Sequence, residues 1–295
     1  MLVDRRISYG PARRPRDDAR KMLEIVSVDG VALLGYAGLG ETAGGMEPCD
    51  WIANVLRDVN LPLEEQLQRI ANATFREFPP HLNRLHTRFP QSSHSVLVAA
   101  FLRGAPRIYS IDIVTALGTG ATRSRFTRHA RPAEVDRKQS SPLIMVGGSG
   151  AAALLGASAM WERPLVKVLK AHDRGAVSAG AVAKMLADIN ERAARRTADR
   201  SVGHRCKVVW RLRDGGGAFQ LFSRGQPEVE QEWVTWPAIV HGMDARQVLD
   251  ATWRFHLGPW LDAKARRIEP PPEATNEEIN AYMQSLPSGP NERLI

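Results

Sequence analysis

The chain has 295 residues, of which 43% are hydrophobic and 24% are charged, a balance typical of a globular protein rather than a disordered one. It is long enough for one large domain or two ordinary ones. Its formal net charge of +8 raises nucleic acid as a partner. No apolar run approaches the roughly 18 to 20 residues of a membrane helix, and no apolar signal-peptide core follows the basic N-terminus. We therefore expect a cytoplasmic protein without membrane contact.

The cysteines and histidines predict neither a disulfide framework nor a metal site. Cys49 and Cys206 are too few for a framework, and no metal-ligand spacing surrounds either of them. Cys206 lies in an alternating apolar pattern, which favours a core residue over a nucleophile. The eight histidines are scattered, and His81, His86 and His94 are not at ligand spacing. We expect no metal and no cofactor.

The first elements of the chain are predicted to be short strands. Leu2-Val3-Asp4 is an apolar pair that runs into an aspartate, as at the end of a strand. We therefore expect the first strand to be truncated and a segment to precede it. Residues 10–20 combine Gly, Pro and charge and are predicted to form a loop. Residues 21–25 and 31–34 are predicted as two strands around the turn Asp29-Gly30.

The middle of the chain alternates between helices and a hairpin. Apolar residues at helical spacing predict one helix around residues 51–56 and a second at 63–78. Residues 95–102 and 107–114 are predicted as a β-hairpin, because Tyr109, Ile111 and Ile113 share one face. Residues 115–140 are polar and basic, and we expect them to form a long excursion.

A second group of helices precedes a final hairpin. Residues 143–146 are predicted as a strand that enters a glycine-rich turn, followed by an alanine-rich helix that Pro164 interrupts. Ser178 is the expected N-cap of the next helix. Residues 206–213 and 218–222 alternate between apolar and polar side chains and are predicted as the last hairpin.

The order of these elements predicts an α+β fold. Paired helices between groups of hairpin strands do not build a parallel βαβ sheet, which needs single crossovers. Two antiparallel sheets that face each other, with a helix pair on each outer side, would bury the apolar faces of both. The fold class is therefore expected to be a four-layer αββα sandwich.

The chain changes character after residue 224, so we divide it into a domain at 1–224 and an extension at 225–295. Residues 241–257 have a helical pattern, and the sequence from Glu269 onward is Pro-rich and charged. We expect the extension to cap a sheet, contact a neighbouring subunit or carry a partner's binding site, with a disordered tail. It contains four closely spaced tryptophans, Trp233, Trp236, Trp253 and Trp260.

The N-terminal motifs resemble a known family. Val3-Asp4-Arg5-Arg6-Ile7-Ser8, a lysine that opens the next strand (Lys21) and the turn Gly35-Tyr36-Ala37-Gly38 are similar to the opening of proteasome β-subunits and their bacterial peptidase relatives, which are N-terminal nucleophile (Ntn) hydrolases. The resemblance covers roughly residues 2–224 and implies the same four-layer sandwich. In that family a threonine at the mature N-terminus precedes the Asp-x-Arg motif. In this sequence only Met1, Leu2 and Val3 precede the motif. The chain therefore matches the family's supporting residues, but none of its residues matches the nucleophile.

The resemblance also implies roles for single residues. Lys21 would be the cation that tunes the N-terminal amine, Asp4 the carboxylate that pairs with it, and Gly38 an N–H donor of the oxyanion hole. The competing interpretation is two solvated charges and an ordinary turn glycine.

Two further segments resemble motifs of the family. Gly147-Gly148-Ser149-Gly150 matches a Gly-Ser-Gly turn whose serine, here Ser149, lies beside the nucleophile. A phosphate-binding loop is disfavoured because the Gly-Lys-Ser/Thr ending is missing. Asp199 and Ser201 match the segment that supports the amine, although the following residues depart from the common pattern and a simple turn is an equal contender.

Three functions follow as hypotheses. The first is a threonine-type peptidase or amidase that acts on a peptide or protein substrate, assembles as a homo-oligomeric ring and has its nucleophile encoded upstream of Met1. The second is a non-catalytic scaffold or interaction subunit. Nucleic-acid binding is third and is disfavoured, because few aromatic residues interleave with the arginine clusters at 123–138 and 192–200.

Overall fold

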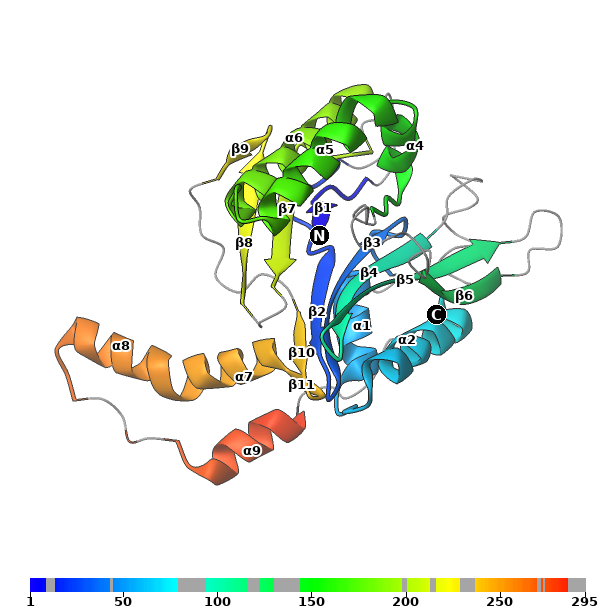
Figure 1. The fold of residues 1–295 in the computed structure, drawn as a ribbon. Helices are drawn as coiled ribbons and strands as arrows, with labels where there is room; N and C mark the ends of the chain where they lie inside the picture. The colour runs from blue at the N-terminus through cyan, green and yellow to red at the C-terminus, as the bar shows by residue number, and fades with distance from the viewer. Residues whose placement is uncertain are drawn as a thin grey trace.

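The computed structural model describes residues 1–8, 14–42, 45–78, 94–115, 122–129, 144–197, 201–212, 216–228, 237–269, 272 and 274–285. These residues form two β-sheets and three groups of helices (Figure 1), so the expected α+β class is confirmed. The smaller sheet has the strand order β1-β7-β8-β9, and the larger has the order β11-β10-β2-β3-β4-β5-β6.

The strands of the two sheets have the following bounds. The smaller sheet contains β1 (Leu2–Asp4), β7 (Arg205–Arg211), β8 (Gly217–Ser223) and β9 (Gln226–Pro227). The larger contains β2 (Met22–Val26), β3 (Gly30–Ala37), β4 (His94–Leu102), β5 (Ala105–Thr115), β6 (Thr122–His129), β10 (Ala238–Val240) and β11 (Met243–Asp244).

The larger sheet owes its main core to residues that alternate along its strands. β2 to β6 pair antiparallel in chain order, with Leu34 opposite Val98 and Val98 opposite Tyr109. Because side chains alternate between the faces of a strand, these three side chains lie on one face, and all are buried. α1 (Pro48–Leu56) and α2 (Leu63–Glu77) cover that face and belong to the same core cluster. The predicted hairpin at 95–102 and 107–114 is confirmed.

The smaller sheet packs against α6 (Ala179–Arg196). Ala183 and Ala187 of this helix form a cluster with Cys206, Val208 and Phe222, so small side chains let the helix approach the strands closely. The Ser178 hydroxyl accepts a hydrogen bond from the Ala181 N–H at 3.2 Å, which confirms the predicted N-cap. α4 (Ser149–Leu155) and α5 (Ser158–Asp173) lie beside α6.

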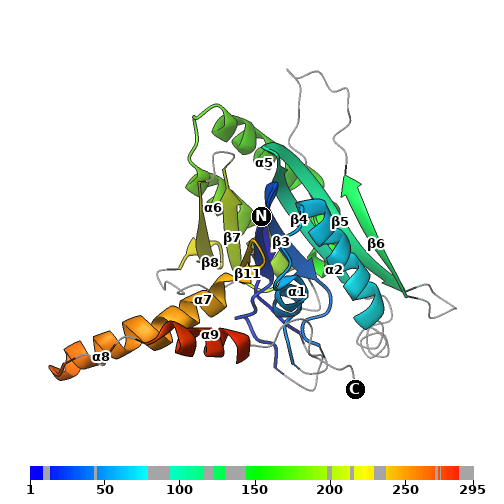
Figure 2. The ribbon, with the colours of Figure 1, turned by 90° about the horizontal axis from the view of Figure 1, so that it is seen from below.

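The cluster that joins the two sheets is small. Val3 and Val209 of the smaller sheet pack against Met22 and Leu33 of the larger one. Figures 1 and 2 show α1 and α2 beside the larger sheet, whereas α4, α5 and α6 lie beside the smaller sheet, in another part of the molecule. The finer expectation of a four-layer sandwich is not confirmed.

Three local predictions are wrong. Residues 144–147 are not in a strand; Ile144 and Val146 instead pack against Trp161 and its neighbours. The stretch 115–140 is not one excursion, because β6 lies within it and pairs with β5 along its length. Pro164 does not interrupt a helix, since α5 runs through it.

The continuity of α5 at Pro164 has a local cause. Proline lacks the N–H that would bond the carbonyl four residues earlier, that of Met160. Arg192 of α6 donates to that carbonyl from Nη1 at 3.3 Å. A partner from the next helix therefore replaces the missing backbone donor.

The chain after residue 225 joins both sheets and then leaves them. β9 pairs with β8, and β10 pairs parallel to β2. The division at residue 224 nevertheless stays a prediction. The elements that follow are α7 (Ala245–Thr252), the π-helix η1 (Trp253–Leu257), α8 (Gly258–Arg266) and α9 (Asn276–Ser285). Among the helices in the described ranges, none combines the length and apolar character needed to cross a bilayer.

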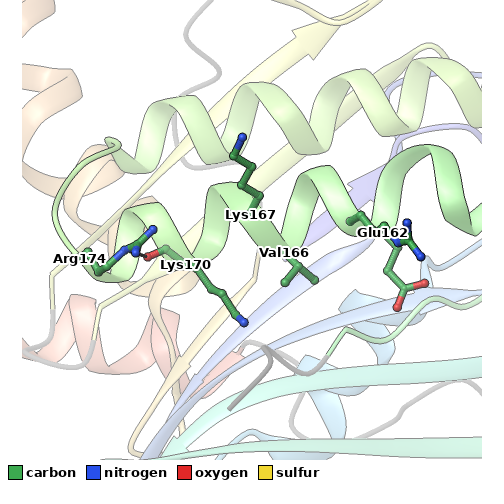
Figure 3. A pocket seen from close by; sticks show the side chains of 6 residues that line it. Glu162, Val166, Lys167, Lys170 and Arg174 are labelled. Carbon is green, nitrogen blue, oxygen red and sulfur yellow. Dashed lines mark hydrogen bonds between the residues drawn. The ribbon is translucent and has the colours of Figure 1, made fainter. Parts of the chain in front are cut away.

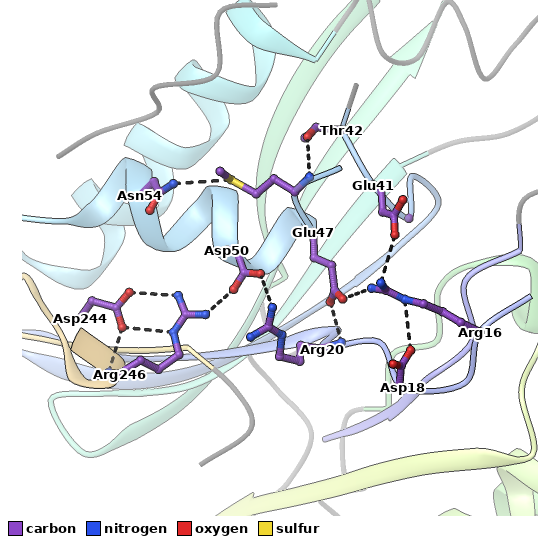
Figure 4. A network of polar contacts seen from close by, with 12 residues as sticks. Arg16, Asp18, Arg20, Glu41, Thr42, Glu47, Asp50, Asn54, Asp244 and Arg246 are labelled. Carbon is purple, nitrogen blue, oxygen red and sulfur yellow. Dashed lines mark hydrogen bonds and ion pairs between the residues drawn. The ribbon is translucent and has the colours of Figure 1, made fainter. Parts of the chain in front are cut away.

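A network of charged side chains anchors this C-terminal part to the first helix (Figure 4). The Arg246 guanidinium contacts the carboxylates of Asp50 and Asp244, and Arg20 reaches Asp50 at 2.9 Å. Asp244 is buried and caps α7 by accepting from the Arg246 N–H at 3.0 Å. The network therefore fixes the start of α7 against α1.

We predict that the contact at Gly35 controls the stability of the sheet junction. A Cβ on Gly35 would lie 2.7 Å from Val3 Cγ1 and 3.0 Å from Met1 Sδ. Gly35→Ala should therefore lower the free energy of unfolding by about 1–3 kcal/mol through overpacking, measured by urea denaturation. Gly180→Ala is the control: its Cβ meets Ser178 Oγ at 3.8 Å, and it should be neutral or slightly stabilising. Equal effects of the two changes would contradict the prediction.

Candidate functional site

Asp4, at the end of β1, is the centre of the candidate site. Lys21 Nζ lies 3.2 Å from each of its carboxylate oxygens. Two backbone groups also donate to Oδ1, the Arg6 N–H at 2.9 Å and the Gly203 N–H at 3.4 Å. The structure thus brings Asp4 and Lys21 together, as the resemblance implied.

Lys21 is held in a largely dry position. Its side chain is 10% exposed and that of Asp4 is 23% exposed. Lys21 directly precedes β2 of the larger sheet, whereas Asp4 belongs to the smaller sheet. The Lys21 carbonyl accepts from the Tyr36 N–H at 3.3 Å, which ties the residue to β3. The ion pair therefore spans the junction between the sheets.

Gly38 lies in the turn that follows β3. Its φ of +114° is in a region that side chains disfavour, and the residue is exposed. The next N–H, that of Leu39, donates to His94 Nδ1 at 3.1 Å. The Tyr36 hydroxyl lies 3.4 Å from the Gly40 carbonyl oxygen. Two buried side chains therefore hold this turn in place.

The glycine-rich turn before α4 meets the same region. A Cβ on Gly148, whose φ is +86°, would lie 2.7 Å from Cβ of Ala37, next to Gly38. A Cβ on Gly150 would lie 2.8 Å from Val202, next to Gly203. The turn that carries Ser149 is therefore wedged between the end of β3 and the segment before β7.

Less of the structure is described around the remaining predicted site residues. Ser149 is the first residue of α4, and its side chain lies outside the described part. Ser201 is half-buried, two residues before Gly203. Asp199 falls outside the described residues. The roles of these three residues stay predictions.

The described thiols are poor nucleophiles. Burial raises the pKa of Cys206 to about 12 and that of Cys49 well above its ordinary value. Cys206 packs in the cluster under α6, as its strand pattern predicted. Within the described ranges, no group of three or more His, Cys, Asp or Glu side chains could hold a metal ion.

His94 is the residue that sequence reasoning missed. It is 1% exposed, and its ring stacks on Tyr36 at 5.8 Å between centroids. Burial lowers the pKa of His94 to about 4, so the neutral ring accepts from Leu39. A signal existed in the sequence: Val96 and Val98 stand at even spacing from His94 on the buried face of β4.

A separate hollow lies on α5 (Figure 3). Its lining comes from this helix and from Arg174, which directly follows it. It includes none of the residues around Asp4, which makes it a surface feature rather than part of the candidate site. The lining residues are Glu162, Arg163, Val166, Lys167, Lys170 and Arg174.

Comparison with known proteins gives weak matches only. No family model matches the chain, and no curated protein matches it. One similar solved structure is Anbu from Hyphomicrobium sp. strain MC1, with 13% identity, a TM-score of 0.39 and coverage of 75% of this chain and 82% of that one. Another is the helical assembly of the Anbu complex from Pseudomonas aeruginosa, with 14% identity, a TM-score of 0.34 and coverage of 93% and 94%.

These findings correct the family assignment made from the sequence. The N-terminal motifs suggested proteasome β-subunits, but no family model matches the chain, and the similar solved structures are of Anbu, which is a different family. The motifs are short and consist of common residue types. A similar order of such motifs therefore did not establish membership of the proteasome β-subunit family.

We predict an asymmetry between the two partners of the ion pair. Lys21→Met leaves Asp4 with two backbone donors, whereas Asp4→Ala leaves a nearly buried ammonium without this carboxylate. Asp4→Ala should therefore cost about 2–4 kcal/mol of unfolding free energy and Lys21→Met about 1 kcal/mol. Chemical denaturation of both variants checks the order, and a larger loss in Lys21→Met would contradict it.

We predict that His94 makes stability depend on pH. Because its folded pKa of about 4 lies below the ordinary value of 6.5, the unfolded state binds more protons between these values. The free energy of unfolding should fall by up to about 3 kcal/mol as pH drops from 7 to 4. His94→Gln should flatten this slope, whereas His256→Gln, at an exposed position, should keep it. An unchanged slope in His94→Gln would refute the prediction.

Proposed function

We propose that the chain is a subunit of an Ntn-type amide hydrolase that acts on a peptide or protein substrate in the cytoplasm. The observation that carries this proposal is the Lys21–Asp4 pair, a nearly dry ammonium held between two sheets. Burying an ion pair costs desolvation, and an apolar replacement is often as stable. Stability alone therefore does not explain a charged pair at the sheet junction, and its presence there favours a catalytic role for Lys21.

The chemistry assigns a role to each residue around the pair. A cation beside a free α-amine favours the neutral form of that amine, which can then act as the base for its own side chain. Lys21 would supply the cation and Asp4 would orient it. The Gly38 turn, held by Tyr36 and His94, would present an N–H to the oxyanion of the tetrahedral intermediate. Ser149 would lie beside the nucleophile, and the segment of Asp199 and Ser201 would support the amine.

The nucleophile in this proposal is a Thr, Ser or Cys upstream of Met1. Within the described residues β1 is an edge strand paired only with β7, so a further strand can pair with its open side. Such a strand would enlarge the smaller sheet toward the four-layer arrangement of Ntn hydrolases.

The test begins with protein purified from its native cell, whose N-terminal residue is sequenced and which is assayed against a fluorogenic peptide library. We expect a mature N-terminus at Thr, Ser or Cys and hydrolysis that Lys21→Met abolishes. Lys170→Met, on the surface of α5, is the matched control and should keep activity. A mature terminus without a hydroxyl or thiol, or activity that survives Lys21→Met, would overturn the proposal.

A non-catalytic scaffold is the second candidate. It is favoured by the exposed apolar side chains of the C-terminal helices, which suit assembly rather than catalysis. Stable assembly without peptide hydrolysis in the same assay would support it.

A further inference from the structure

The hollow on α5 is lined by a row of four exposed cations, here called the basic stripe: Arg163, Lys167, Lys170 and Arg174. They are four, three and four positions apart, which places them within about 60° around a helix and along about 16 Å of its axis. Trp161 and Leu165 are buried and lie on the opposite side of the helix. The stripe therefore faces away from the core that α5 helps to form.

The basic stripe concentrates charge that its neighbours do not neutralise. Residues 158–196 contain eight Lys and Arg against four Asp and Glu, and so carry half of the chain's net charge of +8. On α6, Lys184 and Arg195 each pair at 2.7 Å with a carboxylate four positions away. In the described part of the chain no carboxylate pairs with a member of the stripe. Its members instead have one another as neighbours three or four positions away, and like charges at this spacing destabilise a helix.

The carboxylates beside the basic stripe select the kind of anion that fits it. Glu162 and Asp173 are exposed and lie about 90–110° from the middle of the stripe, both toward the same side. Figure 3 shows Glu162 and Lys167 on opposite sides of α5. A nucleic acid or an anionic membrane presents negative charge to both sides, so these carboxylates would repel it. Trp161 is buried and cannot stack on a base. A protein with a single row of carboxylates fits better.

The spacing of the four cations favours a helix as the partner. A helix laid alongside α5 can repeat the intervals of four, three and four residues, so that each cation meets one carboxylate. In an extended strand, side chains on one face are about 6.8 Å apart, so four of them span about 20 Å. Such a row would drift out of register with the 16 Å stripe.

We propose that the basic stripe docks an acidic helix of a partner protein, whose carboxylates lie opposite the four cations. Complementary charge guides the approach of a partner and fixes its register. Salt screens exposed charges over about 10 Å at 0.1 M, so binding should weaken as the salt concentration rises. The stripe is separate from the candidate site, and the proposal does not depend on the proposed hydrolytic activity.

The first test measures binding of two labelled alanine-based peptides to the full chain by fluorescence anisotropy. One peptide carries four glutamates at the spacing of the basic stripe, and the other carries the same glutamates spread around the helix. The first should bind about tenfold more tightly at low salt, because only its carboxylates face the stripe together. Circular dichroism checks that both peptides are equally helical. Equal affinities would overturn the proposal.

The second test reverses charge on the basic stripe. Lys167→Glu combined with Lys170→Glu should weaken binding of the first peptide by about tenfold or more, and a peptide with lysines at the two central positions should bind instead. Arg76→Glu combined with Arg266→Glu is the matched control, because it changes the net charge equally at exposed positions of α2 and α8. Circular dichroism confirms folding of each variant. An equal loss of binding in both double variants would overturn the proposal.

The third test offers other anions to the same surface. A DNA duplex and vesicles that contain anionic lipid are each added to the complex of the first peptide with the unchanged chain. Neither should displace the peptide, because the carboxylates beside the stripe oppose both. Displacement by the duplex or by the vesicles at an equal concentration of negative charge would show that the stripe accepts a polyanion or a membrane, and the proposal would be wrong.

Discussion

The carboxylate of Asp4 is the point where distant parts of the chain are held together. It receives an ammonium from the residue that precedes β2 and N–H groups from Arg6 and Gly203, the last of which is 199 positions away. A carboxylate that accepts from several donors fixes the position of each donor. If one of them moved away, the carboxylate or the ammonium would lose a partner while largely shielded from water. The positions of both sheets at the junction follow from this constraint.

The backbones of several segments approach one another closely at the candidate site. A Cβ on Gly35, Gly148 or Gly203 would lie within 2.8 Å of a side-chain atom of another element. Glycine at these positions lets three segments converge on a region where ordinary side chains would hold them apart. The candidate site is therefore defined by what the backbone permits as much as by its charged groups, and the Gly38 turn gains its order from neighbouring aromatic rings.

Residue patterns predicted the part of the fold that depends on local order. The alternation in β4 and β5 and the helical spacing in α2 were sufficient, because each of these faces packs on its neighbour in the chain. The failures involve distant partners. Arg192 compensates for Pro164 from another helix, and the parallel pairing of β10 with β2 has no local signal. The proximity of Asp4 to Lys21 followed from a resemblance whose family assignment was wrong, whereas the roles of Ser149, Asp199 and Ser201 stay predictions.

The strand pairings also have a consequence for synthesis on the ribosome. β1 finds its partner in β7, where Leu2 lies opposite Val208, and β2 is flanked by β10, where Glu24 lies opposite Ala238. β1 therefore has no strand partner, and the edge of β2 that does not face β3 stays open, until most of the chain has been translated. At ordinary elongation rates of roughly 5–20 residues per second, this leaves their edges unpaired for on the order of ten seconds or more. Unpaired strand edges are templates for pairing with other chains, so the nascent chain is exposed to aggregation until the last strands emerge.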